Sequence, residues 1–142
     1  MKMTAGLLLL ALFIAGCSPN EKPFEIYNQE VFSFFLEEDN LWEVNSTVQV
    51  RGFQQNEENK KFSHHLTFTV DLISPDGNKQ EGISTGVYQE TATERLSDIQ
   101  FEAQFELDST YSAPSYKLVW NVKDELSGKK ITKEAEFKLS EE

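Results

Sequence analysis

Few side chains in this 142-residue chain carry reactive chemistry, and their spacing limits what they could do. Cys17 is the only cysteine, so its thiol could act as a nucleophile but has no partner within the chain for a disulfide. His64 and His65 are the only histidines. Adjacent residues of a strand point to opposite faces, so at most one imidazole could serve a given catalytic or metal site. We expect His64 to share the face of Leu66 and Phe68 as a core or rim residue.

The acidic clusters do not form a recognisable catalytic or metal site. Glu37-Glu38-Asp39 and Glu57-Glu58 lie in polar, loop-like segments, and solvated acidic loops are the favoured interpretation. Asp76-Gly77-Asn78 and Asp124-Glu125 have too few oxygen donors for a calcium loop, although a weak calcium site formed between loops stays open. The chain has no Gly-x-Ser-x-Gly elbow, phosphate-binding glycine loop or basic-aromatic surface. The sequence therefore predicts no catalytic residue, metal, cofactor or nucleic-acid partner.

Residues 1–16 have the features of an export signal. Lys2 supplies a positive start, and Ala5–Ala15 form an uncharged, mostly apolar stretch. This stretch is shorter than the roughly 20 apolar residues that a membrane-spanning helix needs. It ends in Ile14-Ala15-Gly16-Cys17. This ending resembles the lipobox of bacterial lipoproteins, in which a branched apolar residue and two small residues precede an obligatory cysteine.

The resemblance implies cleavage between Gly16 and Cys17 and attachment of a diacylglyceryl chain to the Cys17 thiol, so that a lipid bilayer is one partner. Ser18 stands where an aspartate would resemble an inner-membrane retention signal. We therefore expect an outer-membrane anchor where the source has such a membrane, and the outer face of the plasma membrane in a Gram-positive source. The alternative is a stray cysteine near an ordinary signal-peptidase site, for which Ala11 and Ala15 offer small side chains.

Cleavage would leave 126 residues, enough for one domain with its own core. It would remove Lys2 alone among the charges, so 12 basic residues would face 24 acidic ones, a net charge of −12. Such a domain repels nucleic acid and anionic lipid head groups, although acidic charge on exported domains most often serves solubility. We divide the chain into a signal peptide (1–16), a lipidated cysteine with a short tether (17–23) and one domain (24–142).

Apolar residues alternate with polar ones along most of the domain, and this period of two predicts antiparallel strands buried on one face. Such stretches lie at residues 41–53, 66–72, 99–107, 116–122 and 131–139, with weaker ones at 31–36 and 83–88. Ser74-Pro75-Asp76-Gly77 and Asp124–Lys129 have the composition of turns. We expect a polar loop at residues 54–61, and residues 91–96 could form a helical turn.

About seven short strands separated by turns fit two packed sheets with Greek-key connections. The pattern resembles bacterial immunoglobulin-like domains most clearly over Ser112–Leu139, where Tyr116-x-Leu118-x-Trp120-x-Val122 precedes a turn and a last strand. The resemblance implies an all-β, immunoglobulin-like Greek-key β-sandwich. It also implies that Tyr116 begins the penultimate strand and bonds back to the upstream corner. Because the paired cysteines of antibody-type domains are absent, packing alone must hold the core.

The segment Val31–Leu36 is too apolar to be explained by one buried face. Alternation would place Phe32, Phe34 and Leu36 on one side and Val31 and Phe35 on the other. The favoured interpretation is a strand covered on both sides. The alternative is that Phe32, Phe34 and Phe35 are exposed and form a docking site for a protein or peptide.

These observations predict a non-catalytic, membrane-anchored lipoprotein of the cell envelope that acts as a protein-binding or structural module. The alternative is an envelope accessory factor that recognises glycan or peptide through exposed aromatic residues, for which Trp42 and Trp120 are candidates. A hydrolase is the least favoured class, and it would require a buried pair of carboxylates in a pocket.

Overall fold

The computed structural model describes residues 22–112 and 114–140, so Gly16 and Cys17 lie outside the described residues. Within these ranges the chain forms eight strands and no helix. They are β1 (Glu25–Leu36), β2 (Leu41–Arg51), β3 (Asn56–Glu58), β4 (Lys61–Ile73), β5 (Lys79–Ala92), β6 (Asp98–Asp108), β7 (Tyr116–Asp124) and β8 (Lys130–Phe137). The predicted all-β class is confirmed. A strand lies in each of the seven predicted stretches, although β2 ends before the end of 41–53 and β8 before the end of 131–139.

Two local expectations are wrong. Residues 91–96 form no helical turn, because β5 continues through Ala92 and the chain then bends. The expected polar loop at 54–61 contains β3, which pairs with the start of β4. Asn59 and Lys60 connect these two strands with φ angles of 51° and 61°. A two-residue hairpin turn requires positive φ at both central residues. The polar segment therefore forms a hairpin, and β3 is a strand in addition to the seven predicted.

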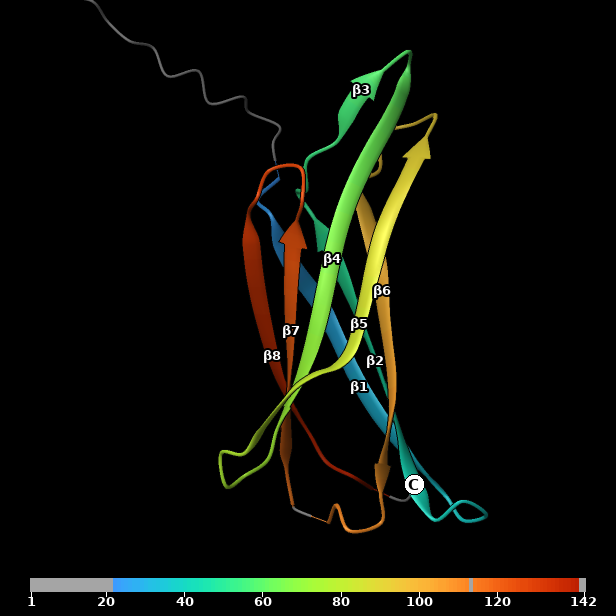
Figure 1. Cartoon of the computed structure of the whole chain (residues 1–142), viewed down its shortest axis with the longest axis vertical. Coiled ribbons are helices and arrows are strands. Elements are labelled where there is room, and N and C mark those ends of the chain that lie inside the picture. The colour runs from blue at the N-terminus through green and yellow to red at the C-terminus, as the bar shows by residue number, and fades with distance from the viewer. Residues whose placement is uncertain (1–21, 113, 141–142) are drawn as a thin grey trace, which may run out of the picture.

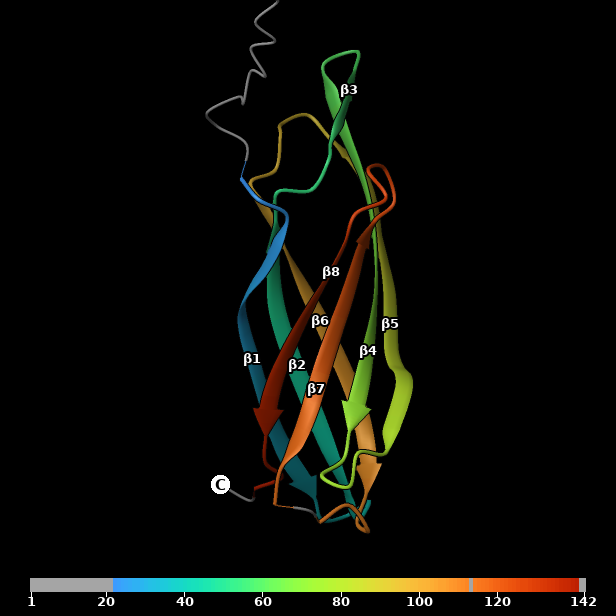
Figure 2. The ribbon, with the colours of Figure 1, turned by 90° about the vertical axis from the view of Figure 1, so that its left-hand side faces the viewer.

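The strands form two antiparallel sheets (Figure 1). The three-stranded sheet has the order β1-β2-β6. In the other sheet β4 lies between β5 and β7, β8 follows β7, and β3 extends the start of β4. Figure 2 looks onto the edge formed by β1 and β8 and shows the sheets as two layers, with β2 behind β1 and β4 in the opposite layer. The fold is therefore a two-layer sandwich.

Side chains from the inner faces of both sheets form one core. Trp120 of β7 is fully buried, and its Nε1 donates a hydrogen bond of 3.0 Å to Ser46 Oγ of β2. Ser46 Oγ in turn donates to the Glu30 carbonyl oxygen at 2.9 Å. The ring centroid of Phe68 lies 5.4 Å from that of Phe101 in the opposite sheet. Aromatic packing and one buried polar contact thus join the two layers.

A β-bulge interrupts the pairing of β1 with β2. Ile26 pairs with Val50, and both are buried in the core. Regular pairing resumes at Glu30 and Thr47, which leaves one extra residue on β1. Asn28 lies in this bulge with φ of 48°, a left-handed conformation that asparagine adopts more readily than most residues. Because side chains alternate with a period of two, the extra residue reverses which side chains of β1 face the core.

The two ends of the sandwich differ in what they present. The described chain begins toward the end of the long axis from which the hairpin of β3 and β4 projects, and the turn between β1 and β2 (residues 37–40) lies at the other end (Figures 1 and 2). Glu37, Glu38 and Asp39 form the tip of this turn and are exposed. None of the described residues belongs to a helix with the length and apolar character needed to cross a bilayer.

Candidate binding surface on the three-stranded sheet

The bulge of β1 leaves Phe32 and Phe34 on the outer face of the three-stranded sheet. Their side chains are 47% and 48% exposed. The ring centroids lie 5.5 Å apart in an edge-to-face arrangement. The favoured expectation of a strand covered on both sides is therefore wrong for the described structure. Neighbouring exposed aromatic rings are the kind of surface that marks an interaction site.

Phe35 does not belong to this exposed pair. It lies on the inner side of β1 with Val31, and both are partly buried. Its ring packs against Trp42 of β2, with 5.0 Å between centroids. The structure thus brings together Phe32 and Phe34 and separates the third predicted partner-binding residue from them. Neither tryptophan forms an outward platform, because Trp42 packs against the core and Phe35, and Trp120 is fully buried.

Polar and acidic side chains of β2 and β6 continue the outer face beside the two rings. The strand register places Asn45 opposite Phe32 and Glu43 opposite Phe34. Glu106 lies opposite Glu43 on its other side, and Asn45 Nδ2 donates to Glu43 Oε1 at 2.9 Å. We call this surface the aromatic-acidic face. Its residues are Glu30, Phe32 and Phe34 of β1, Glu43, Asn45 and Thr47 of β2, and Glu102, Gln104 and Glu106 of β6.

Negative charge is concentrated on the three-stranded sheet. Within the bounds given above, β1, β2 and β6 together carry seven carboxylates and one basic residue, Arg51. The five strands of the other sheet carry eight carboxylates and six lysines. Arg51 forms an ion pair with Glu25 and lies over the ring of Tyr27, 4.7 Å from its centroid. It is therefore engaged at the far end of β2 from Glu43.

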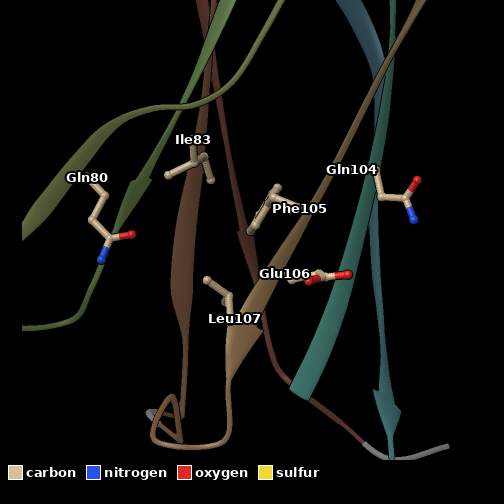
Figure 3. A pocket seen from close by; sticks show the side chains of 6 residues that line it. All are labelled: Gln80, Ile83, Gln104, Phe105, Glu106 and Leu107. Atoms are coloured by element: carbon tan, nitrogen blue, oxygen red, sulfur yellow. The ribbon is translucent and has the colours of Figure 1, made fainter. Parts of the chain in front are cut away.

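An open cleft of about 630 Å³ lies between β5 and β6. In Figure 3 the side chains of Phe105 and Leu107 point toward Ile83, whereas those of Gln104 and Glu106 point away from it. Glu106 is the one ionisable side chain among the described lining residues, and it belongs to the aromatic-acidic face. The cleft thus offers apolar contact but brings no acid and base together.

His64 lies on the face of Leu66 and Phe68, as predicted. It is 2% exposed, and its ring centroid lies 5.7 Å from that of Phe53. Burial lowers the pKa of His64, an effect that the negative charge of Glu90 on β5 opposes. Among the described residues, Nδ1 of His64 has no hydrogen-bond partner. Its environment therefore favours the neutral imidazole.

A buried carboxylate that the sequence did not single out as structural organises the turn between β7 and β8. Asp124 is 1% exposed. Its Oδ2 accepts hydrogen bonds from the Gln54 backbone N–H at 2.8 Å and from Ser127 Oγ at 2.7 Å. Its Oδ1 accepts from the Leu126 backbone N–H at 3.0 Å. Asp124 thus joins the segment after β2 to the last turn.

Asp71 plays a similar part on the other side of the five-stranded sheet. Its Oδ1 accepts from the Gly82 backbone N–H at 2.8 Å, and its Oδ2 accepts from Asn121 Nδ2 at 2.9 Å. Lys79 Nζ lies 3.4 Å from Oδ2. These contacts hold the start of β5 against β4. The described residues bring no three histidine, aspartate or glutamate side chains together in a group that could hold a metal ion.

The comparisons with known proteins show a likeness to solved structures but no family. No family model and no curated protein matches the chain. One solved structure, the Northeast Structural Genomics Consortium target SoR45, has 16% sequence identity and a TM-score of 0.44, and the match covers 80% of this chain and 86% of that one. A target from Bordetella pertussis that carries the name ApaA has 14% identity and a TM-score of 0.44, over 84% of this chain and 96% of that one.

Proposed function

We propose that this protein is a bacterial lipoprotein, anchored to a membrane of the cell envelope through acylated Cys17, that acts as a non-catalytic protein-binding module. Its sandwich would present the aromatic-acidic face to a partner in the envelope. The observation that carries the proposal is the exposure of Phe32 and Phe34 as an adjacent pair on a bulged strand.

The cost of the bulge supports a binding role for these rings. Asn28 adopts a left-handed backbone conformation, which is less favourable than the extended one for residues other than glycine, although asparagine tolerates it better than most. Both polar atoms of the neighbouring Gln29 amide are buried without a hydrogen-bond partner among the described residues. The bulge thus combines two unfavourable local features and turns Phe32 and Phe34 outward rather than into the core. Local strain that is kept in a fold is frequently associated with a functional surface.

We further propose that the sandwich is an immunoglobulin-like Greek key. The order β1-β2-β6 in one sheet and β5-β4-β7-β8 in the other supports an assignment to strands A, B and E and to strands C′, C, F and G. Tyr116 begins β7, the penultimate strand, and is 3% exposed. Its ring lies against Phe137 and Tyr111, with centroid distances of 5.8 and 6.0 Å. This is the position of the corner tyrosine in that family.

The anchor and the fold together orient the proposed surface. A tether of residues 17–23 spans on the order of 25 Å at most when fully extended. It would join the sandwich at the end where the described chain begins, so the β1–β2 turn at the other end would point away from the bilayer. Phe34 lies two residues before the end of β1 and close to this turn. The aromatic pair would therefore lie on the part of the domain that is turned away from the lipid, where it would be open to other proteins of the envelope.

Site-specific photocrosslinking in the native membrane tests this function. The photoreactive residue p-benzoylphenylalanine replaces Phe32 or Phe34 in the whole lipidated chain, and Val87 of β5 provides the matched control. Val87 is 63% exposed but lies on the other sheet. We expect a discrete protein adduct from positions 32 and 34 and none from position 87. Equal adducts from all three positions, or none from any, would overturn the proposal.

A further inference from the structure

Resting on the proposed function, we propose that the partner docks on the aromatic-acidic face with a cationic segment. Its lysine or arginine side chains would pair with Glu43, Glu102 and Glu106 while their stems and guanidinium planes cover Phe32 and Phe34. Aromatic faces attract cations, and carboxylates at the rim fix the direction of approach. The two kinds of group on this face therefore suit the same side chain.

The distribution of charge argues for a cationic occupant over a second copy of this chain. Among the described strands of the three-stranded sheet, Arg51 is the one basic residue, and it pairs with Glu25, far along the sheet from Phe32 and Phe34. Two copies meeting through this face would therefore bring carboxylates against carboxylates. Anionic lipid head groups would be repelled for the same reason. Of the three occupants, a second copy, an anionic lipid surface and a basic segment, the negative charge of this face attracts only the basic segment.

The pairing of Glu43 with Glu106 supports the same conclusion. The two residues lie directly opposite each other on neighbouring strands, where like charges destabilise a sheet. Asn45 Nδ2 donates a hydrogen bond to Glu43. The one basic residue of the described β1, β2 and β6, Arg51, pairs with Glu25 at the other end of β2 and does not neutralise Glu43 and Glu106. A cation placed between the two carboxylates would relieve this repulsion. The face is thus less favourable alone than with a basic partner.

Fluorescence anisotropy with defined peptides tests the proposal on the whole chain, purified in a neutral maltoside detergent. The probe is a labelled peptide of about ten residues that alternates Arg with Thr, and its counterpart alternates Glu with Thr. The paired substitutions Phe32→Ser with Phe34→Ser, and Glu43→Gln with Glu106→Gln, remove the two kinds of contact. Glu134→Gln with Glu136→Gln is the control, because it removes the same charge from exposed positions of β8.

We expect the Arg peptide to bind and the Glu peptide not to bind. Each pair of substitutions on the aromatic-acidic face should weaken binding by about tenfold or more, and the β8 pair by less than about twofold. The Glu43→Gln, Glu106→Gln protein should also unfold at a higher temperature, because the repulsion is gone, while it binds more weakly. Higher stability combined with lower affinity would not arise from mere damage to the fold.

Each of the following outcomes would overturn the inference. Equal weakening by the β8 pair would mean that the peptide responds to net charge alone. Binding of the Glu peptide as tight as that of the Arg peptide would exclude a cationic preference. A photocrosslink at position 34 without any binding of the Arg peptide would leave the proposed function standing with a partner of other chemistry, whereas loss of both would refute both.

Discussion

Single buried polar side chains hold the loops of this sandwich, and Asp124 shows how. Its two oxygens accept hydrogen bonds from Gln54, Leu126 and Ser127, which lie on two separate segments. Asp124 is 1% exposed. If its carboxylate were removed, each of these donors would be left without a partner in an interior that water does not reach easily. A hydrophobic core alone would leave these loops free to move.

We predict that Asp124→Asn destabilises the protein by about 2–3 kcal/mol, since one acceptor becomes a donor that faces other donors. Asp76→Asn is the control, because Asp76 accepts one hydrogen bond, from the Asn78 backbone N–H, in an exposed turn. That change should cost less than about 1 kcal/mol. Urea unfolding followed by tryptophan fluorescence measures both values. Equal losses for the two variants would contradict the role given to Asp124.

The burial of His64 predicts that stability depends on pH near neutrality. Burial lowers the pKa of His64 below its ordinary value of 6.5, so the unfolded chain takes up the proton first as the pH falls. The stability contributed by the neutral imidazole is complete above pH 6.5 and is lost as the pH falls from there through the lower pKa of the folded state.

We therefore expect the unfolding temperature to decrease from pH 8 to pH 5, and to decrease less in His64→Leu. Calorimetry at several pH values measures this difference. His65→Gln is the control, because His65 lies on the outer face of β4. The unfolding temperature of this variant should still decrease with pH as that of the wild type does. Identical pH profiles for the wild type and His64→Leu would contradict the assignment.

At the scale of strands, alternation predicts which residues share a face but not which face is inside. It correctly groups Phe32 with Phe34 and Phe35 with Val31. The face that each group takes is set by one extra residue near Asn28, and a single insertion leaves the alternation on either side of it unchanged. The exposed pair could therefore be named from the sequence as a candidate, but its exposure could not be derived.

Strand lengths show a similar limit. β5 runs from Lys79 to Ala92, well beyond the predicted stretch 83–88, because it pairs with β4 along most of its length. Its exposed edge position leaves many polar residues in the strand, and these carry no alternating apolar signal. Tertiary pairing rather than local composition decides where such a strand begins and ends.

The bulge makes a prediction at the scale of the element. Asn28→Val should destabilise the protein by about 1–2 kcal/mol, because a β-branched residue is disfavoured at the observed φ of 48°. Asn28→Gly should be tolerated within about 0.5 kcal/mol, because glycine adopts this conformation freely, although its hydrogen bond to Gln49 is lost. Chemical unfolding of both variants measures the difference. A Val variant as stable as the Gly variant would mean that the bulge is absent in solution.

For the whole molecule, the charge of the domain determines what the proposed anchor would have to do. The part after residue 16 has a net charge of −12, with 12 basic and 24 acidic residues, and most membrane surfaces carry negative charge of their own. Electrostatics therefore opposes rather than assists adsorption of the domain to a bilayer. If the protein is the lipoprotein proposed above, its attachment would have to come from acyl chains, each buried methylene of which contributes about 0.8 kcal/mol.

Cys17→Ala accordingly tests the proposed anchor. One acyl chain holds a protein only marginally, whereas the two or three of a mature lipoprotein hold it firmly, so loss of the modified thiol should release the protein from membranes. We expect the variant in the soluble fraction and without label after growth with radioactive palmitate. Cys17→Ser should behave in the same way, since a hydroxyl does not replace the thiol in this modification. Membrane association that persists in both variants at high salt would mean that a contact other than lipid holds the protein there.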